Sequence, residues 1–502
     1  MKFITQLKQL VKYFFMIITA SILLMQVAIA SNVFTANNLY SQLNYEQARI
    51  AYLEATKVGS PHAYYQLGTI YYKGQGIKPD FLSSLIWFSL AAEYQYNDAE
   101  NIVAQLMESI DPEQRPEVQE LVDNFKAKHG KKIITQKYLP EIIPPELHNK
   151  ITFISYEEEE QSIVESFNDF DGSQLDDDVL LALLDENDTE ITADVLPTVK
   201  NPKNLPYFSV VDYDIAADGS IRNITTLHSI GRQANIDTAI YNLSMNNIKQ
   251  PMFNNKPTGF MKRGYLGVAK YSRATMRNKH KDLYNSIKRI TKKLAQSKSA
   301  NDRYKHTMAL LYFTWAPQKK GMAIKMLKTL AEEGHVNAQY EYGIYLYREQ
   351  LNLKEAIKWL SLASQFGLSK AEYRLAKILQ DSPWVVNDER KSLFWYESAA
   401  QQNHPTATLK AAELRLLAKD KSLHDQEAAV NYLKSIESIQ SDNPEYNYLV
   451  AISHLKGEYR DFKKVVNHLR LAIARGKKLN WDVSLWEEQL DRWTTGNVYI
   501  KD

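Results

Sequence analysis

The 502-residue sequence contains no cysteine, and this absence excludes disulfide frameworks, thiolate zinc sites and cysteine nucleophiles. Glycine and proline are sparse, at 18 and 16 residues, so collagen-like and low-complexity chains are excluded as well. The formal net charge is only +2, which gives no overall field that would attract nucleic acid. After residue 30, no apolar run is long enough to span a bilayer. A hydrophobic fraction of 44% in a chain of this length predicts about two to four ordered globular domains.

Residues 1–30 have the pattern of a secretory signal peptide. Three lysines precede an apolar run at residues 13–24, and Ala28 and Ala30 form the small-x-small end of a cleavage site. We expect cleavage there and a mature periplasmic chain that begins near Ser31, since a cysteine-free sequence suits an oxidising compartment. The alternative is an uncleaved inner-membrane anchor, because the apolar stretch is at the short end of what can span a bilayer.

Residues 40–130 are amphipathic and are predicted to form helical-hairpin repeats. They contain a G-x-P-x-A turn, a helix with Leu-Gly, a G-x-G loop and a tryptophan-bearing helix that ends in two alanines. The residues that carry this pattern are Gly59, Pro61, Ala63, Leu67, Gly68, Tyr71, Gly74, Gly76, Asp80, Trp87, Ala91 and Ala92. The stretch resembles the Sel-one-like repeat family, a branch of the tetratricopeptide superfamily. The resemblance implies antiparallel helix pairs that stack into a solenoid, because one pair cannot bury its own apolar face.

Residues 280–495 show the same helical pattern less completely. Turns align at Gly334, Gly367 and Asn403, with 33 residues between the first two, and Trp359 and Trp395 recur on the second helix of each unit. A period in the thirties with two helices per unit indicates a helical solenoid. A glycine or asparagine after a helix can adopt the left-handed cap. This block is therefore predicted to contain degenerate Sel-one-like or general tetratricopeptide-like units.

Charge is segregated around the middle of the chain. Residues 131–204 are predicted to be mostly a linker, and within them residues 151–199 contain no lysine or arginine but many aspartates and glutamates. Such a run repels itself and resists packing. The helix that follows at residues 277–293 is strongly basic. We interpret it as a solvated helix face that could shield the acidic linker or touch an anionic membrane surface.

Residues 205–275 break the helical pattern. Their β-branched and aromatic residues predict strands at 208–215, 221–228 and 265–271. Asp218-Gly219 supplies the tight turn of the first hairpin, and a helix is expected at residues 235–247. The order of elements is therefore ββαβ.

This ββαβ segment resembles the C-terminal domain of the TonB family, the periplasmic part of an energy transducer. The matching residues are Tyr213-Asp214-Ile215, Asp218-Gly219, Asn223-Ile224, Ser229, Pro251 and Pro257. An acidic spacer stands in place of the proline-rich spacer typical of that family. The resemblance implies a role near outer-membrane transport proteins.

The sequence predicts no catalytic, cofactor-binding or metal site. None of the 11 histidines forms an H-x-x-x-H or H-E-x-x-H cluster, and His62, His335 and His404 lie at repeat turns, where we expect them to pack or cap helices. The acidic runs lack the spacing that surrounds a calcium ion. Gly74-Gln75-Gly76 lacks the Gly-Lys-Ser/Thr that completes a phosphate loop. The 31 tyrosines suit helix seams, and some could line a peptide groove.

The sequence as a whole predicts a mainly α protein, with two α-solenoid blocks and a small α+β domain of TonB-like ββαβ order between them. We expect a non-enzymatic protein–protein interaction scaffold of the bacterial envelope, accessory to TonB-type outer-membrane transport. Its expected partners are envelope proteins or peptides and not nucleic acid. The alternative is an envelope enzyme or a regulator of cell-wall enzymes.

Overall fold

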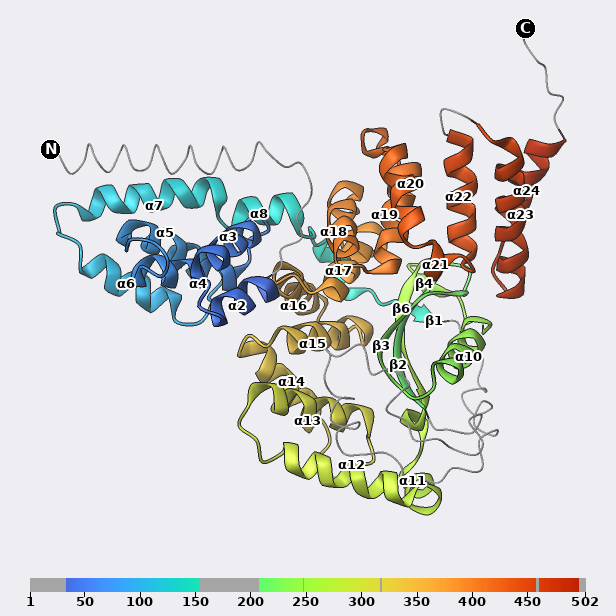
Figure 1. Ribbon diagram of the computed structural model, residues 1–502, viewed down its shortest axis with the longest axis horizontal. Helices are drawn as coiled ribbons and strands as arrows, with labels where there is room; N and C mark the ends of the chain where they lie inside the picture. The colour runs from blue at the N-terminus through green and yellow to red at the C-terminus, as the bar shows by residue number, and fades with distance from the viewer. Residues whose placement is uncertain (1–32, 154–206, 247, 317, 457–459, 496–502) are drawn as a thin grey trace, which may run out of the picture.

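The computed structural model describes residues 33–153, 207–246, 248–316, 318–456 and 460–495. Within these ranges the chain is a mainly helical solenoid with two small antiparallel sheets near its centre (Figure 1). The predicted fold class is confirmed to that extent. The predicted signal peptide and residues 154–204 of the predicted linker lie outside the described residues. None of the helices in the described ranges has the length and apolarity needed to cross a membrane.

The N-terminal block is built from antiparallel helix pairs. Its helices are α2 (Val33–Ser41), α3 (Tyr45–Thr56), α4 (Pro61–Lys73), α5 (Phe81–Ala92), α6 (Ala99–Glu108), α7 (Arg115–His129) and α8 (Lys131–Tyr138). Local sequence explains the α4–α5 hairpin, since Ser60 caps α4 and Gly74 ends it at a left-handed φ of 65°. At Gly68 a Cβ atom would lie 2.8 Å from the ring of Phe88, so glycine lets the two helices approach closely. The repeat turn predicted from these glycines is confirmed.

Residues 131–153, the start of the predicted linker, pack against the C-terminal block. After α8 they form η1 (Pro144–His148) and β1 (Thr152–Phe153). The Ile143 N–H donates to the Trp384 carbonyl at 2.9 Å, and the Gln350 side chain bonds both backbone groups of Ile151. This part differs from the acidic run because it carries apolar residues, such as Ile151, that become buried. The helical and strand structure therefore extends about 20 residues further than the sequence indicated.

The C-terminal block is an arc of antiparallel helix pairs (Figure 1). Its elements are α11 (Arg273–Lys279), α12 (Lys281–Leu294), α13 (Ala300–Tyr312), α14 (Met322–Glu332), α15 (Val336–Arg348), α16 (Leu353–Gln365), α17 (Ser369–Asp381), α18 (Glu389–Gln401), α19 (Pro405–Leu417), η6 (Lys421–Leu423), α20 (Gln426–Ser435), α21 (Glu437–Gln440), α22 (Pro444–Lys456), α23 (Phe462–Lys478) and α24 (Ser484–Thr494). The turn residues Gly334, Gly367 and Asn403 all have positive φ, at 89°, 95° and 59°. The left-handed caps predicted at these turns are confirmed.

The strand-rich segment forms one sheet in the order β3-β2-β6 and a smaller one in the order β1-β4-β5, both antiparallel. Its elements are β2 (Phe208–Ile215), β3 (Ile221–Ile230), α10 (Gln233–Ser244), β4 (Pro251–Phe253), β5 (Lys256–Pro257), β6 (Phe260–Gly267) and η5 (Val268–Lys270). The strand predicted at residues 208–215 is confirmed, since β2 begins and ends at these residues. The last strand was expected at 265–271 but begins at residue 260, because all of β6 pairs with β2. It ends at Gly267, where φ is 64° and a Cβ atom would lie 1.9 Å from the Tyr207 carbonyl oxygen.

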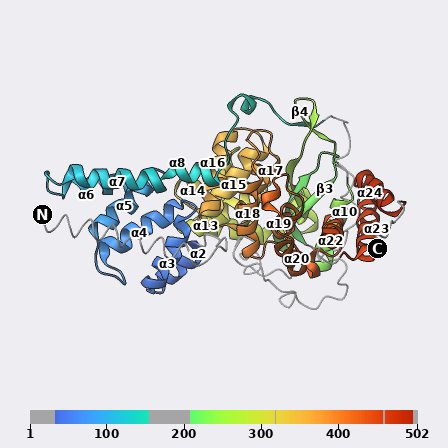
Figure 2. The same cartoon turned by 90° about the horizontal axis from the view of Figure 1, so that it is seen from above.

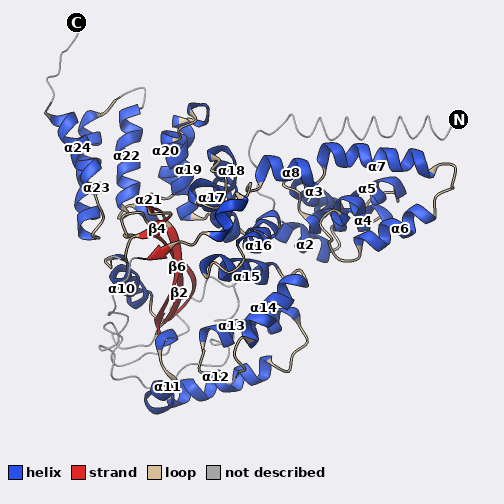
Figure 3. Cartoon of the chain, turned by 180° about the vertical axis from the view of Figure 1, so that it is seen from behind, coloured by secondary structure: helices blue, strands red, loops and turns tan. Residues whose placement is uncertain are grey.

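The sheet lies inside the arc of the C-terminal block. Figure 3 shows its strands between α10 and the helices α13 to α17. Every residue of β2 is buried. Val211, Tyr213 and Ile215 face the α10 side, where they pack with Leu243. Phe208 and Val210 belong instead to the main core of the arc, so the sheet forms part of that core.

The two helical blocks are in contact. Figure 2 shows the N-terminal block extending from one side of the molecule, with α8 reaching the C-terminal block. The Val33 N–H donates to the Phe366 carbonyl at 3.3 Å, and the rings of Phe34 and Phe366 meet edge to face at 4.9 Å. Gln365 donates to the Val58 carbonyl at 2.9 Å. The N-terminal repeats are therefore joined to the middle of the second block and are not an isolated unit.

Candidate functional site

Helix α15 contacts the sheet through buried charges. Arg263 on β6 donates through Nε to Oδ1 of Asp212 on β2 at 2.7 Å and through Nη1 to Glu341 on α15. The side chains of these three residues are at most 5% exposed. The Tyr340 hydroxyl also donates to Asp212, at 3.2 Å. Burial alone would lower the pKa of Arg263, but the two carboxylates raise that pKa well above its ordinary value.

A second buried pair lies two residues further along β2, at Asp214. Arg374 on α17 donates through Nη1 to Oδ1 of Asp214 at 2.7 Å. Tyr373 and Asn223 donate to Oδ2 of the same carboxylate, at 2.9 and 3.0 Å. Burial would raise the pKa of Asp214, but Arg374 and then Lys377 hold it below its ordinary value. Asp214 is therefore a carboxylate with a donor on each oxygen.

A third cluster joins the β2–β3 hairpin to α19 and α22. Arg222 contacts Asp218 at 2.9 Å and Glu445 at 3.3 Å, and Lys410 contacts Glu445 at 2.9 Å. The Arg222 guanidinium also lies 4.2 Å from the centre of the Trp481 ring. Burial would raise the pKa of Glu445, but Lys410 and Arg222 lower it to about 2. These contacts hold the end of the sheet against the last helices of the arc.

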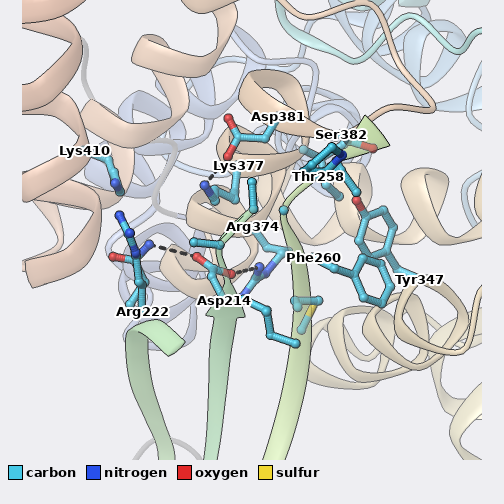
Figure 4. A pocket seen from close by; sticks show the side chains of 18 of the residues that line it. Asp214, Arg222, Thr258, Phe260, Tyr347, Arg374, Lys377, Asp381, Ser382 and Lys410 are labelled. Carbon is cyan, nitrogen blue, oxygen red and sulfur yellow. Dashed lines mark hydrogen bonds and ion pairs between the residues drawn. The ribbon is translucent and has the colours of Figure 1, made fainter. Parts of the chain in front are cut away.

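The second and third clusters border a cavity of about 330 Å³ at this end of the sheet. In Figure 4, Arg222 and Lys410 lie on one side and the rings of Phe260 and Tyr347 lie on the other. Arg374 on α17 lies between these two sides. The cavity therefore has one charged wall and one apolar wall. We take it as the candidate functional site.

Three buried polar atoms beside the cavity have no hydrogen-bond partner, Arg374 Nε, Asn223 Oδ1 and Ser382 Oγ. Leaving a buried donor or acceptor unsatisfied costs about 1–3 kcal/mol, so such atoms are uncommon in folded proteins. All three residues line the cavity, and a molecule held there could satisfy these atoms. This is a feature of a binding site.

The arrangement offers binding groups more readily than catalytic ones. The described lining of the cavity contains no histidine, and its carboxylates Asp214, Asp381 and Glu445 are held in ion pairs. A general acid or base needs a pKa near the working pH, whereas the pKa values of Asp214 and Glu445 are lowered. In the part of the chain that the structure describes, no group of three or more His, Asp or Glu residues could hold a metal ion.

The histidines at the repeat turns have structural roles, as predicted. His335 and His404 cap α15 and α19, each accepting a backbone N–H through Nδ1. His62 lies between the Asn37 amide and the Tyr96 hydroxyl, 2.8 Å from each. Gly74 to Gly76 form the end of α4 and the following repeat loop.

The tyrosine-rich helices have a different setting from the one expected, whereas the basic stretch 277–293 has the solvated face that was predicted. The tyrosines that could have lined a peptide groove include Tyr340 and Tyr373, whose hydroxyls bind the chain's own β2. The concave face of the arc is therefore covered by the sheet. Along the basic stretch 277–293, the apolar residues of α12 are buried while its cations, such as Lys288 and Lys292, are exposed.

Sequence reasoning did not identify the charged residues of the sheet as part of a site. One signal was present, because Asp212 and Asp214 alternate with valine and tyrosine inside a predicted strand, where aspartate is depleted. A buried aspartate in a strand needs a cationic partner. The cationic partners Arg263 and Arg374 could not be found from local pattern, since one belongs to a later strand and the other to a distant helix.

Comparison with known proteins identifies the repeats. The Sel1 repeat family matches at residues 61–93, 336–365 and 369–404. These segments correspond to α4–α5, α15–α16 and α17–α18. Units of the second block, predicted only as degenerate or general repeats, are thus of the same type as the unit in the first. No curated protein matches this chain.

Two solved structures are similar to the chain at low identity. One is a Sel1 repeat protein from Oxalobacter formigenes, with 21% identity, 42% of this chain and 60% of that chain covered, and a TM-score of 0.32. This chain thus spans less than two thirds of that protein. The other is a protective antigen present in uropathogenic Escherichia coli strains, described as displaying an SLR fold, with 16% identity, 89% and 67% covered, and a TM-score of 0.34. The repeats matched in both helical blocks identify the chain as a Sel1-like repeat protein.

Proposed function

We propose that this protein is a non-enzymatic protein–protein interaction scaffold of the bacterial envelope that acts beside TonB-type outer-membrane transport. Sel1 repeats are typical of bacterial interaction scaffolds. The observation that carries the proposal is the sheet, which the buried ion pairs Arg263–Glu341 and Asp214–Arg374 hold on the repeats. Among the described strands, β3 pairs only with β2 and so has an outer edge without a strand partner. An extended segment of a partner can add to such an edge.

The shape of β3 favours a selective partner. Its pairing with β2 is interrupted by register shifts between Val210 and Val211 and between Asp212 and Asp214. Bulges of this kind twist an edge strand and discourage indiscriminate strand addition. The order of β2, β3, α10 and β6 also supports the likeness to the TonB C-terminal domain, from which the link to outer-membrane transport comes.

Site-specific crosslinking in cells tests this proposal. A photo-reactive amino acid at Thr226, an exposed residue of β3, should capture an outer-membrane transport protein. The same group at Lys292, exposed on α12, is the matched control and should not capture that protein. Capture of cell-wall synthases from Thr226 would favour the alternative role as a regulator of cell-wall enzymes. Equal capture from both positions would contradict a role for the β3 edge.

The envelope location is tested by the N-terminus of the mature protein. We expect the protein isolated from the periplasm to begin near Ser31, because Ala28 and Ala30 complete a signal-peptide cleavage site. Sequencing by Edman degradation or mass spectrometry measures this directly. A membrane-bound form that retains its first residues would instead establish the inner-membrane anchor.

A further inference from the structure

We propose that the cavity between the sheet and helices α17, α19 and α22 binds a small organic carboxylate with an apolar body. The cavity measures about 330 Å³, which is at the lower end of the range for small-molecule sites. Its walls come from the β2–β3 hairpin, the loop before β6 and the inner helices of the arc. This inference does not depend on the scaffold role proposed above.

Arg374 and Lys377 carry more N–H donors than the acceptors around the cavity use. The Arg374 guanidinium carries five N–H groups, of which Nη1 serves Asp214 while Nε is buried and unpaired. Lys377 donates to Asp381, although an ammonium carries three donors. Both oxygens of Asp214 are occupied, since Arg374 serves one and Tyr373 and Asn223 serve the other, whereas the amide oxygen of Asn223 has no donor. A ligand rich in acceptors, such as a carboxylate, fits this imbalance.

The opposite wall defines the rest of the ligand. The rings of Phe260 and Tyr347 are stacked at 5.8 Å between centroids, and Met261 and Ile378 also line the cavity. An apolar group that covers these side chains would leave water on binding, which adds affinity in proportion to the area buried. A carboxylate on the Arg374 side and an apolar group on the Phe260 side would therefore occupy both walls together.

Two sources can supply this chemistry, namely a free acid and the C-terminus of a peptide that ends in an apolar residue. Isothermal titration calorimetry of the full chain separates the two sources. The probes are N-acetylphenylalanine, its amide, acetate and a pentapeptide ending in phenylalanine. We expect N-acetylphenylalanine to bind and its amide and acetate to bind much more weakly. Binding of the pentapeptide at comparable affinity identifies a peptide C-terminus as the ligand, whereas its exclusion identifies a free acid.

The variant Lys377→Gln removes one cation of the cavity and leaves the hydrogen bond between Arg374 and Asp214 in place. Because a hydrogen bond to a charged group is involved, we expect N-acetylphenylalanine to bind about 10- to 100-fold more weakly to this variant. The matched control is Lys328→Gln, which breaks a pair of the same i,i+4 spacing with Glu332 on α14, away from the cavity. The control should bind like the unaltered chain, and circular dichroism checks that both variants are folded.

Three results would overturn the proposal. The first is the absence of binding by N-acetylphenylalanine and by the pentapeptide. The second is equal binding of N-acetylphenylalanine and its amide, which would show that the carboxylate is not recognised. The third is an equal loss of affinity in Lys377→Gln and Lys328→Gln, which would place binding outside the cavity.

Discussion

At the scale of single residues, Glu372 on α17 is a buried carboxyl group whose hydrogen-bond partners are neutral. The Ser398 hydroxyl donates to one oxygen at 2.9 Å and the Gln402 amide donates to the other at 2.8 Å. Burial raises the pKa of Glu372 to about 8, although both hydrogen bonds act in the opposite direction. The folded protein therefore binds a proton here that the unfolded chain releases near pH 4.5.

This difference makes the stability of the fold depend on pH. A pKa that is raised on folding contributes stability below the unfolded value of 4.5, and that stability is lost as pH rises through about 8. The full loss would be about 4–5 kcal/mol. We predict that Glu372→Gln flattens the dependence and is the more stable form at pH 8, since an amide stays neutral. Urea unfolding between pH 6.5 and 9 measures this pH dependence. His404 does not interfere in that range, because burial lowers its pKa to about 4. Parallel curves for the two proteins would contradict it.

Trp395 has a role that its repeat position alone does not indicate. It is fully buried, and its indole N–H donates to the Tyr138 carbonyl of α8 at 2.7 Å. Trp359, its counterpart one repeat earlier, bonds only within α16, to Glu355. Truncating either to alanine should cost about 3–5 kcal/mol, because each fills a packed seam. Only Trp395→Ala should also increase amide hydrogen exchange in α8, and equal exchange there in both variants would count against this role.

At the scale of elements, the sheet is joined to the arc by buried charged side chains. Arg263 compensates both Asp212 and Glu341, so its removal leaves two buried carboxylates without a cation. We predict that Arg263→Met costs about 3–5 kcal/mol in chemical unfolding. The triple variant Arg263→Met, Asp212→Asn, Glu341→Gln should recover most of that loss, since no charge is then left unpaired. A single variant as stable as the unaltered chain would show that the pair is not needed to hold the sheet.

At the scale of the whole molecule, the charge segregation seen in the sequence remains to be tested. The acidic stretch, residues 154–199, lies outside the described residues. The described chain resumes at Tyr207, whose carbonyl accepts the Val268 N–H just before α11. Chain connectivity therefore limits the distance between the acidic stretch and the exposed cations of α12. We predict that the two attract each other, so the radius of gyration should grow as salt rises and the Debye length falls from about 10 Å at 0.1 M to about 3 Å at 1 M. Small-angle scattering measures this, and a radius independent of salt would rule out the attraction.

Much of the architecture could be predicted from sequence because the repeats are local. A glycine or asparagine at positive φ, a capping histidine and a tryptophan on the second helix act within one helical hairpin, so their spacing alone predicts the turns at residues 334, 367 and 403. The first β-hairpin could be predicted for the same reason, since Asp218-Gly219 sets its turn. The late start predicted for β6 was wrong. Lys262, Arg263 and Gly264 do not form the β-branched and aromatic pattern typical of a strand, and they are extended because they pair with β2.

The repeat units, the strand-rich insert and the signal-like N-terminus can be recognised from local sequence pattern. That the insert fills the concave face of the second block, and that a cavity remains at its end, becomes visible only in the folded chain. The residues that make these contacts lie far apart along the chain. Asp214 and Arg374 are separated by 160 residues, and each reads in isolation as an ordinary charged residue. The pair becomes recognisable only when folding removes water from both side chains and makes each the partner that the other requires.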